Sequence, residues 1–99
     1  MEKIKIAIAA DHAGFELKKE IVKKFQDQGV KVKDFGTFSP DPVDYADYAH
    51  PLAEAVESKE YPIGISICGS GNGINMTVNK HPGIRSAICW NEEIARLAR

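Results

Sequence analysis

Short apolar runs alternate with segments of helical periodicity along this chain, and that alternation constrains its fold more than any other feature. Four runs rich in isoleucine, valine and alanine predict buried strands, at residues 4–10, 30–35, 63–68 and 84–89. Strands that alternate with helices are typical of a parallel sheet covered by helices on both faces. Because the chain has 99 residues, we expect one α/β domain over residues 1–99.

Helix signals fill the segments between these runs. The first helix has an apolar residue every four positions, at Leu17, Ile21 and Phe25. Its lysines are expected to lie away from this stripe: Lys18, Lys19, Lys23 and Lys24. Gly29 is a candidate C-terminal cap. A second helix is expected within 44–58, with Pro51 in its first turn. A third is expected over 71–79, and Asn91 is a candidate N-cap for a fourth.

Charge and composition exclude several classes of partner. The formal net charge is −1, so no long-range field would attract nucleic acid or an anionic membrane, and neither is expected as a partner. No apolar run approaches the length of a membrane span. Met1-Glu2-Lys3 leads directly into the first predicted strand without a signal peptide, which predicts a cytoplasmic protein. Cys68 and Cys89 are then expected to be reduced thiols.

Cys68 ends the third predicted strand, and a glycine-rich turn, Gly69-Ser70-Gly71-Asn72-Gly73, follows it at once. The helix dipole favours the thiolate form of a thiol at the start of a helix. The backbone N–H groups there can hold an oxyanion. A base beside an anion site suits an enzyme that removes a proton next to a carbonyl group. A second interpretation stays open, in which the cysteine only packs and the turn itself requires the glycines.

Polar residues also follow the other predicted strands, at Asp11-His12, Gly36-Thr37 and Cys89-Trp90. Ligands bind beyond the carboxyl ends of parallel strands, so we expect these residues to converge with Cys68 on one edge of the sheet. Asp11 is of a type that commonly caps helices. His12 is a candidate for binding an anion or a hydroxyl group, since capping does not account for it.

Four further polar residues are more easily explained without a functional role. Tyr45 lies at the start of the second predicted helix, where interface packing is the favoured interpretation. His50 and His81 flank prolines and are expected to be surface turn residues. Lys80 is expected to be a solvated charge at a helix end.

Nucleotide and metal motifs are weak or absent in the sequence. No P-loop motif occurs, and Gly69-x-Gly71-x-Gly73 is one residue short of the dinucleotide fingerprint and follows the third strand instead of the first. His12, Cys68 and Cys89 are expected at one sheet edge, but their spacing matches no regular zinc pattern. We therefore expect neither a P-loop nucleotide site nor a metal site.

Several motifs, each present once, occur in a defined order and spacing between the first predicted strand and Arg99. They are Ile8-Ala9-Ala10-Asp11-His12-Ala13-Gly14-Phe15, Asp34-Phe35-Gly36-Thr37, Asp44-Tyr45, Ile67-Cys68-Gly69-Ser70-Gly71-Asn72-Gly73-Ile74, Asn79-Lys80 and Gly83-Ile84-Arg85. This combination resembles the ribose/galactose-6-phosphate isomerase family, and within it the ribose-5-phosphate isomerase B group. The resemblance implies a Rossmann-like parallel sheet with helices on both faces.

The resemblance also implies an activity, the cofactor-independent conversion of ribose 5-phosphate to ribulose 5-phosphate through a cis-enediolate. Cys68 matches the general base of one branch of the family, because Ile74 stands where a second branch has a glutamate. Ser70 matches the hydroxyl group that assists ring opening, and His12 matches a contact near the phosphate. The residues that match substrate contacts are Asp11, His12, Tyr45, Gly69, Ser70, Gly71, Asn72 and Gly73.

The resemblance further implies a homodimer, or a dimer of dimers, with shared active sites. Family members continue beyond the position of Arg99 with a general-acid histidine, a further strand and helix, and phosphate-binding arginines. We therefore expect the C-terminal strand and helix of the family to be missing from this chain. Three alternatives stay open: an isomerase of a hexose phosphate such as galactose 6-phosphate or allose 6-phosphate, a non-catalytic phosphosugar-binding domain, and a thiol sensor built on Cys68 and Cys89.

Overall fold

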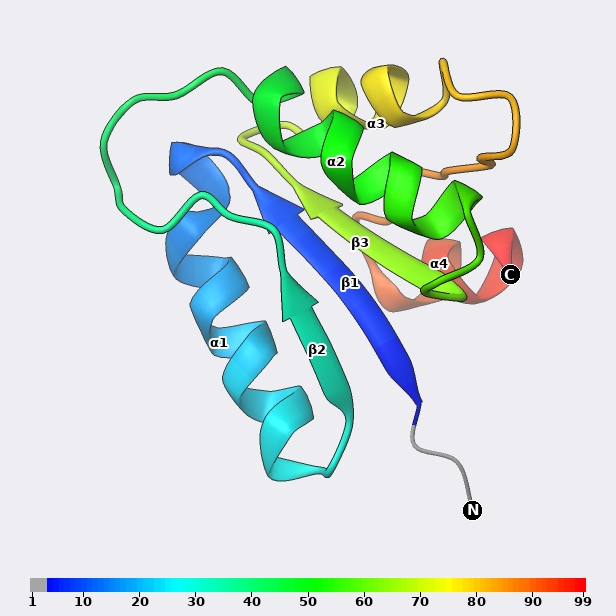
Figure 1. Cartoon of the computed structure of the whole chain (residues 1–99), viewed down its shortest axis with the longest axis horizontal. Coiled ribbons are helices and arrows are strands. Elements are labelled where there is room, and N and C mark those ends of the chain that lie inside the picture. Colours follow the sequence, from blue (N-terminus) through cyan, green and yellow to red (C-terminus); the bar gives the residue numbers. More distant parts are fainter. Residues whose placement is uncertain (1–3) are drawn as a thin grey trace.

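A three-stranded parallel sheet forms the middle of the computed structural model, which describes residues 4–99 (Figure 1). The strands are β1 (Lys5–Ala10), β2 (Lys31–Asp34) and β3 (Ile63–Ile67), in the order β2-β1-β3. The helices are the short 3-10 helix η1 (His12–Gly14), α1 (Phe15–Asp27), α2 (Ala46–Glu57), α3 (Asn72–Val78) and α4 (Glu92–Ala98). Met1-Glu2-Lys3 lie outside the described residues. No helix within residues 4–99 is long and apolar enough to cross a bilayer.

Helices cover both faces of the sheet, as the sequence predicts (Figure 1). α2 packs on β1 and β3 and contacts α3, whereas α1 packs on β1 and β2 from the other side. Every strand pair is parallel, and β1 is bonded on both sides, with Ile8 opposite Asp34 of β2 and Ile65 of β3. The carboxyl ends of β1 and β3 therefore lie next to each other.

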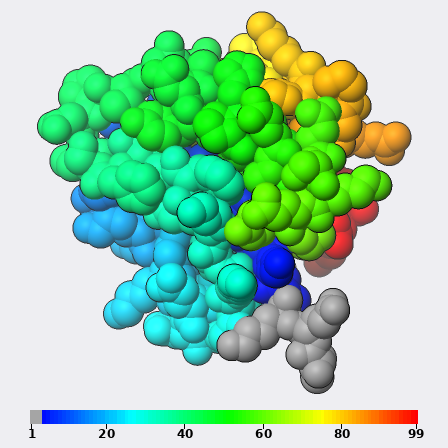
Figure 2. Space-filling view, viewed as in Figure 1, coloured from blue at the N-terminus to red at the C-terminus, as the bar shows by residue number. Residues whose placement is uncertain are grey.

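The central strand β1 is enclosed by the elements around it. Ala7 and Ala9 are 0% exposed and pack against Leu52 of α2. In the space-filling view, blue atoms of the first described residues are visible at the lower right, where Ile4 and Lys5 are exposed, and elsewhere only in small patches between later segments (Figure 2). A second buried cluster joins the two helices on that face and consists of Ala49, Ala53, Ile74 and Val78. Small side chains on β1 and α2 allow these layers to approach closely.

The buried residue of α1 is Lys18, whose side chain is 1% exposed, whereas Leu17 is 50% exposed. The Lys18 Nζ lies 2.5 Å from the Oδ2 atom of Asp34 on β2. It also lies 5.7 Å and 5.1 Å from the ring centroids of Phe15 and Phe38. The prediction that the lysines of this helix lie away from the apolar stripe is thus wrong for Lys18. A carboxylate and two aromatic rings compensate for its loss of hydration.

The ends of the first two helices show one success and one error. Gly29 has a φ of 80° and follows the C-cap of α1, as predicted. α2, by contrast, begins at Ala46, where the Oδ1 of Asp44 accepts the Ala46 N–H. Pro51 consequently lies inside α2, so its predicted place in the first turn is wrong. Its missing N–H interrupts one backbone bond, and Pro51 itself lies on the exposed side of the helix.

The segment 84–89 is not a strand, so the fourth predicted strand is wrong. The side chain of Asn79 holds the backbone of Ser86 at both polar groups, accepting its N–H at 2.8 Å and donating to its carbonyl oxygen at 2.9 Å. A side-chain amide therefore binds the groups that a neighbouring strand would otherwise bind. Within residues 4–99, β3 is an edge of the sheet.

Candidate active site

Cys68 follows β3 directly, and its half-buried side chain packs against the cluster between α2 and α3. Its Sγ accepts a hydrogen bond from the N–H of Gly71 at 3.2 Å. Gly71 is the N-cap of α3 and has a φ of 80°, a backbone conformation that favours glycine. The thiol therefore lies at the start of a helix, where the sequence predicts it.

The glycine-rich turn uses two of its own N–H groups. The Gly71 N–H points to Cys68, and the Asn72 N–H donates to the Oγ of Ser70 at 3.1 Å. None of the hydrogen bonds formed within residues 4–99 uses the N–H groups of Gly69, Ser70 or Gly73. The number of donors that the turn could offer to an oxyanion is thus smaller than the five expected from the sequence.

Asp11 and His12 leave β1 beside this turn. The Oδ1 of the buried Asp11 accepts the N–H of Gly14 at 3.1 Å, so Asp11 caps η1 as its residue type predicts. A Cβ on Gly14 would lie 2.6 Å from the Cγ2 of Ile67, and one on Gly69 would lie 3.6 Å from the Cβ of Ala13. The segment after β1 and the segment after β3 are therefore in contact.

The ring of His12 is oriented by the backbone of Val43. Its Nδ1 lies 3.0 Å from the Val43 nitrogen and 3.2 Å from the Val43 oxygen. A neutral imidazole accepts the Val43 N–H at Nδ1, which places its proton on Nε2. The exposed His12 side chain can then donate from Nε2 to an anion. The sequence gives no local signal for this contact, because the partners are 31 residues apart.

Tyr45 reaches the glycine-rich turn from the start of α2. Its half-buried ring packs on the same cluster as Cys68. A Cβ on Gly73 would lie 2.7 Å from the Tyr45 Cζ, so the absence of a side chain at Gly73 makes room for the ring. The structure thus brings together three segments that the sequence singles out, at 11–14, 43–45 and 68–73.

The turn after β2 also lies at the carboxyl edge of the sheet, where hydrogen bonds to the Ala10 backbone and to the Asp34 side chain hold it. The Ala10 N–H donates to the Gly36 oxygen at 2.6 Å, and the Thr37 N–H donates to the Ala10 oxygen at 2.7 Å. The Oδ1 of Asp34 accepts the Gly36 N–H at 2.9 Å while its other oxygen binds Lys18. The sequence analysis places Asp34 in a family motif and Lys18 on the solvated side of the first helix, and it does not predict that the two side chains form a pair that positions this turn.

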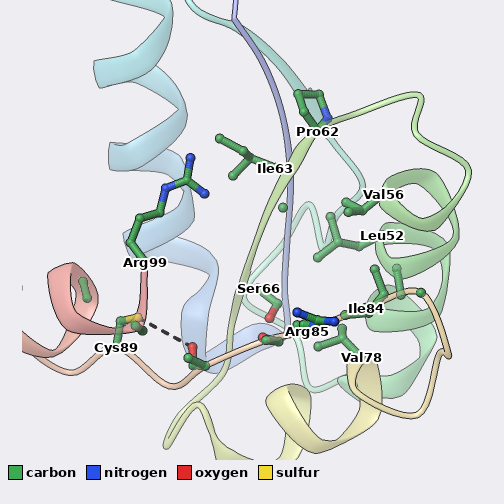
Figure 3. A pocket seen from close by; sticks show the side chains of 17 residues that line it. Leu52, Val56, Pro62, Ile63, Ser66, Val78, Ile84, Arg85, Cys89 and Arg99 are labelled. Carbon is green, nitrogen blue, oxygen red and sulfur yellow. Dashed lines mark hydrogen bonds between the residues drawn. The ribbon is translucent and has the colours of Figure 1, made fainter.

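Cys89 does not join Cys68. It is exposed and lines a separate cavity of about 490 Å³ between β3 and the segment 84–89 (Figure 3). Its Sγ lies 3.6 Å from the carbonyl oxygen of Ala87. Ser66 of β3 and the side chains of Arg85 and Arg99 also line this cavity. The predicted convergence of all strand ends thus fails at Cys89, because its segment is not part of the sheet.

The remaining candidates lie away from Cys68. Lys80 is exposed in the turn after α3, as expected. His81 lies in that turn but is half-buried, and His50 lies on α2, so the prediction that both are surface turn residues is wrong. Across residues 4–99, no group of three or more histidine, cysteine, aspartate or glutamate side chains is arranged to hold a metal ion.

A thiol, an imidazole and a glycine-rich turn lie beyond the carboxyl ends of a parallel sheet, which is where α/β proteins with open parallel sheets commonly bind small molecules. The family model described as "Ribose/Galactose Isomerase" matches residues 6–99. The chain belongs to this ribose/galactose isomerase family.

Individual relatives agree with this membership. The chain is 46% identical over 95 residues to ribose-5-phosphate isomerase B of Escherichia coli strain K12. This match covers 96% of the chain and 64% of the relative. The structure of ribose-5-phosphate isomerase B from Clostridium thermocellum matches with a TM-score of 0.95 and 48% identity, over 97% of this chain and 65% of that one. A third match is the enzyme of the same name from Mycoplasma genitalium with bound ribulose-5-phosphate, at a TM-score of 0.92 and 37% identity, over 100% of this chain and 66% of that one. The chain thus spans about two thirds of the length of these relatives.

Proposed function

We propose that the protein is an aldose–ketose isomerase that interconverts ribose 5-phosphate and ribulose 5-phosphate without a cofactor. The observation that carries this proposal is the position of the Cys68 Sγ, 3.2 Å from the Gly71 N–H at the carboxyl end of β3. This places a candidate base within a turn of backbone donors. The names of the relatives in this family support the choice of reaction and substrate.

Cys68 acts as the general base in the proposed reaction. Its thiolate removes the proton from C2 of the open-chain aldose, and the C–H electron pair forms the C1–C2 double bond while the carbonyl oxygen on C1 becomes an oxyanion. A proton then moves from the C2 hydroxyl to the C1 oxygen, and the thiol returns its proton to C1. The N–H groups of Gly69, Ser70 and Gly73 are the candidates for stabilising the enediolate, because Gly71 and Asn72 are already bonded.

The residues around Cys68 bind and prepare the sugar. His12 donates from Nε2 to the phosphate, since its Nδ1 is taken by Val43. The Oγ of Ser70 accepts the Asn72 N–H, so its own proton is directed elsewhere and is available to the ring oxygen during opening. Asp11 contacts a sugar hydroxyl group through the oxygen that does not cap η1, and Tyr45 lines the pocket.

A hexose 6-phosphate is the second candidate substrate, because the family model covers galactose isomerases as well. The test is a direct measurement of aldose–ketose conversion by NMR, with ribose 5-phosphate, galactose 6-phosphate and allose 6-phosphate at equal concentrations. Faster conversion of ribose 5-phosphate is expected. Preference for a hexose phosphate would select the second candidate. Binding without any conversion would favour a phosphosugar-binding protein instead.

We further propose that the active protein is a homodimer. Large apolar side chains lie exposed on the described surface, with Trp90 71% exposed and Leu97 73% exposed. Such side chains are enriched at interfaces between subunits. Light scattering at several concentrations should give twice the mass of one chain, and a monomer at all concentrations would contradict the proposal.

A further inference from the structure

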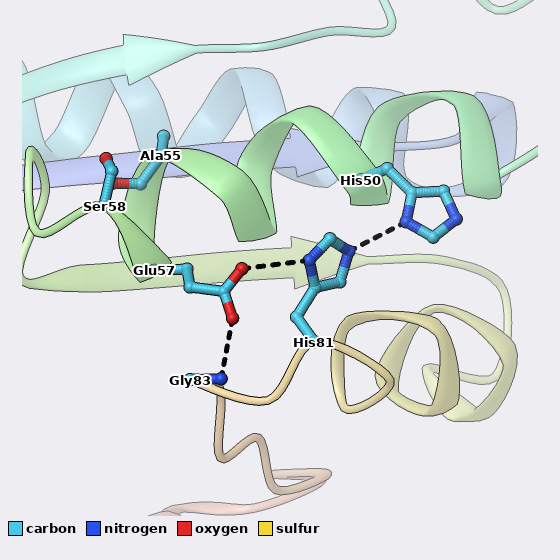
Figure 4. Close-up of polar contacts among 6 residues, drawn as sticks. All are labelled: His50, Ala55, Glu57, Ser58, His81 and Gly83. Carbon is cyan, nitrogen blue, oxygen red and sulfur yellow. Dashed lines mark hydrogen bonds and ion pairs between the residues drawn. The ribbon is translucent and has the colours of Figure 1, made fainter.

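Two histidines from separate elements meet on the surface formed by α2 and α3, away from Cys68. The Nδ1 of His50, on α2, lies 2.9 Å from the Nε2 of His81, in the turn after α3 (Figure 4). The ring centroids are 5.1 Å apart and the rings are tilted by 51°. α2 and α3 are packed together through Ala49, Ala53 and Val78, so the two rings are presented by fixed elements.

Glu57 orients the ring of His81. Its Oε1 lies 3.4 Å from the His81 Nδ1, and its Oε2 accepts the Gly83 N–H at 2.7 Å (Figure 4). A Cβ on Gly83 would lie 2.8 Å from the Glu57 Cγ, so the glycine permits this close approach. Because the carboxylate favours a proton on Nδ1 of His81, the lone pair on Nε2 points toward His50. The contact between the two rings then needs one proton, supplied by His50.

We propose that His50 and His81 chelate a divalent transition-metal ion that prefers tetragonal coordination, Cu²⁺ or Ni²⁺, and that binding releases the Nδ1 proton of His50 to solvent. Two metal–nitrogen bonds of about 2.05 Å at a right angle span about 2.9 Å, whereas a tetrahedral angle needs about 3.3 Å. The 2.9 Å between the two nitrogens therefore fits neighbouring positions of a square-planar or tetragonal ion.

The environment of the pair matches a metal site with solvent ligands. His50 is exposed, so an ion can reach the pair and water can fill its remaining positions. The His81 side chain is 15% exposed and is oriented by Glu57, in the way that carboxylates orient metal-binding histidines. Two protein ligands make a modest site, consistent with the absence of any three-residue metal cluster within residues 4–99.

The test uses calorimetric titration of the intact protein with Ni²⁺. One site is expected, with binding at least about tenfold weaker in His50→Gln and in His81→Gln. Glu57→Gln keeps both nitrogens but loses the carboxylate, and affinity should fall by about 10–100-fold, as for other groups that orient a ligand. His12→Gln removes the third histidine of the chain and should leave Ni²⁺ affinity unchanged.

The coordination itself is read from the electron paramagnetic resonance spectrum of the Cu²⁺ adduct. Two equatorial nitrogens are expected in the unsubstituted protein and one in His50→Gln. Because His50 lies exposed on a helix, that variant should fold even if His81→Gln does not. Equal Ni²⁺ affinity in His50→Gln and the unsubstituted protein, or a single nitrogen in both spectra, would overturn the proposal.

Discussion

Lys18 Nζ and Asp34 Oδ2 lie 2.5 Å apart, but the two side chains are buried to very different degrees, at 1% and 26% exposure. The pair connects α1 to the last residue of β2. Since the second Asp34 oxygen holds the Gly36 N–H, the pair also fixes the turn that bonds to Ala10 at the end of β1. An ion pair on one face of the sheet thereby supports the edge where the candidate site lies.

The unequal burial of this pair predicts unequal costs of losing each partner. Asp34→Asn leaves the buried ammonium without a counter-charge and should cost about 3 kcal/mol of unfolding free energy. Lys18→Met leaves a carboxylate that still reaches water, and should cost about 1–2 kcal/mol. Urea denaturation of both variants measures this difference. Equal losses, or a larger loss for Lys18→Met, would contradict the expected asymmetry.

Cys68→Ser should abolish isomerisation while the fold is retained. A hydroxyl group ionises only at far higher pH than a thiol, so serine supplies almost no anionic base, and loss of a positioned base typically lowers the rate by about 10²–10⁴-fold. Turnover of ribose 5-phosphate and the circular dichroism spectrum are the two measurements. Cys89→Ser is the matched control, because Cys89 lines the separate cavity and its substitution should leave turnover unchanged. Substantial turnover in Cys68→Ser would remove Cys68 as the base.

Ser70→Ala should slow the conversion of the cyclic sugar more than that of an open-chain analogue. Its hydroxyl group accepts the Asn72 N–H and has its proton available for the ring oxygen. Rates with the two substrates are compared under saturating conditions. Equal losses on both would point to a role in holding the turn and would exclude the ring-opening role.

Gly73→Ala should displace the Tyr45 ring, because the new Cβ would lie 2.7 Å from the ring. We expect a loss of about 1 kcal/mol of unfolding free energy, at the low end of overpacking costs, since a ring can swing aside. In the Tyr45→Ala background the same substitution should be neutral or stabilising, because alanine favours helix over glycine. A double-mutant cycle measures this coupling. Additive effects would mean that the two residues do not touch.

Asn79→Ala should release the segment 84–89. It removes both side-chain bonds to the Ser86 backbone and should cost about 1–3 kcal/mol. Amide hydrogen exchange at Ser86 is the sensitive measurement, and it should accelerate. Ser86→Ala is the control, since it keeps the N–H and carbonyl that Asn79 binds and should leave exchange at that position nearly unchanged.

Features that depend on neighbours in the chain were predicted from the sequence. The alternation of strands and helices, the capping by Asp11 and the left-handed Gly29 all follow from local residue types. The parallel topology then brings Cys68 and His12 to the same edge, because both follow strands that pair side by side. The roles of these residues in catalysis remain predictions.

Features that depend on distant partners were not predicted. Lys18 looks like a solvated charge until Asp34, 16 residues away, is placed beside it. The apolar pattern of 84–89 resembles a strand, but Asn79 binds the backbone at Ser86. The partners of His81 are Glu57 and His50, 24 and 31 residues away, and the spacing of nearby residues does not predict either contact. Periodicity reports whether a segment is apolar or extended, and it does not report which groups satisfy its hydrogen bonds.

The methyl groups of Ala7 and Ala9, both 0% exposed, act as a spacer between the sheet and α2. The thickness of that spacer determines how far Tyr45, at one end of α2, stands from the strand ends where His12 and Cys68 emerge. One added methylene at Ala9 would push α2 away from the sheet and so change the distance between Tyr45 and the strand ends. Apparently conservative substitutions in the interior of this protein should therefore be recognised first by altered substrate affinity, before any loss of folded protein.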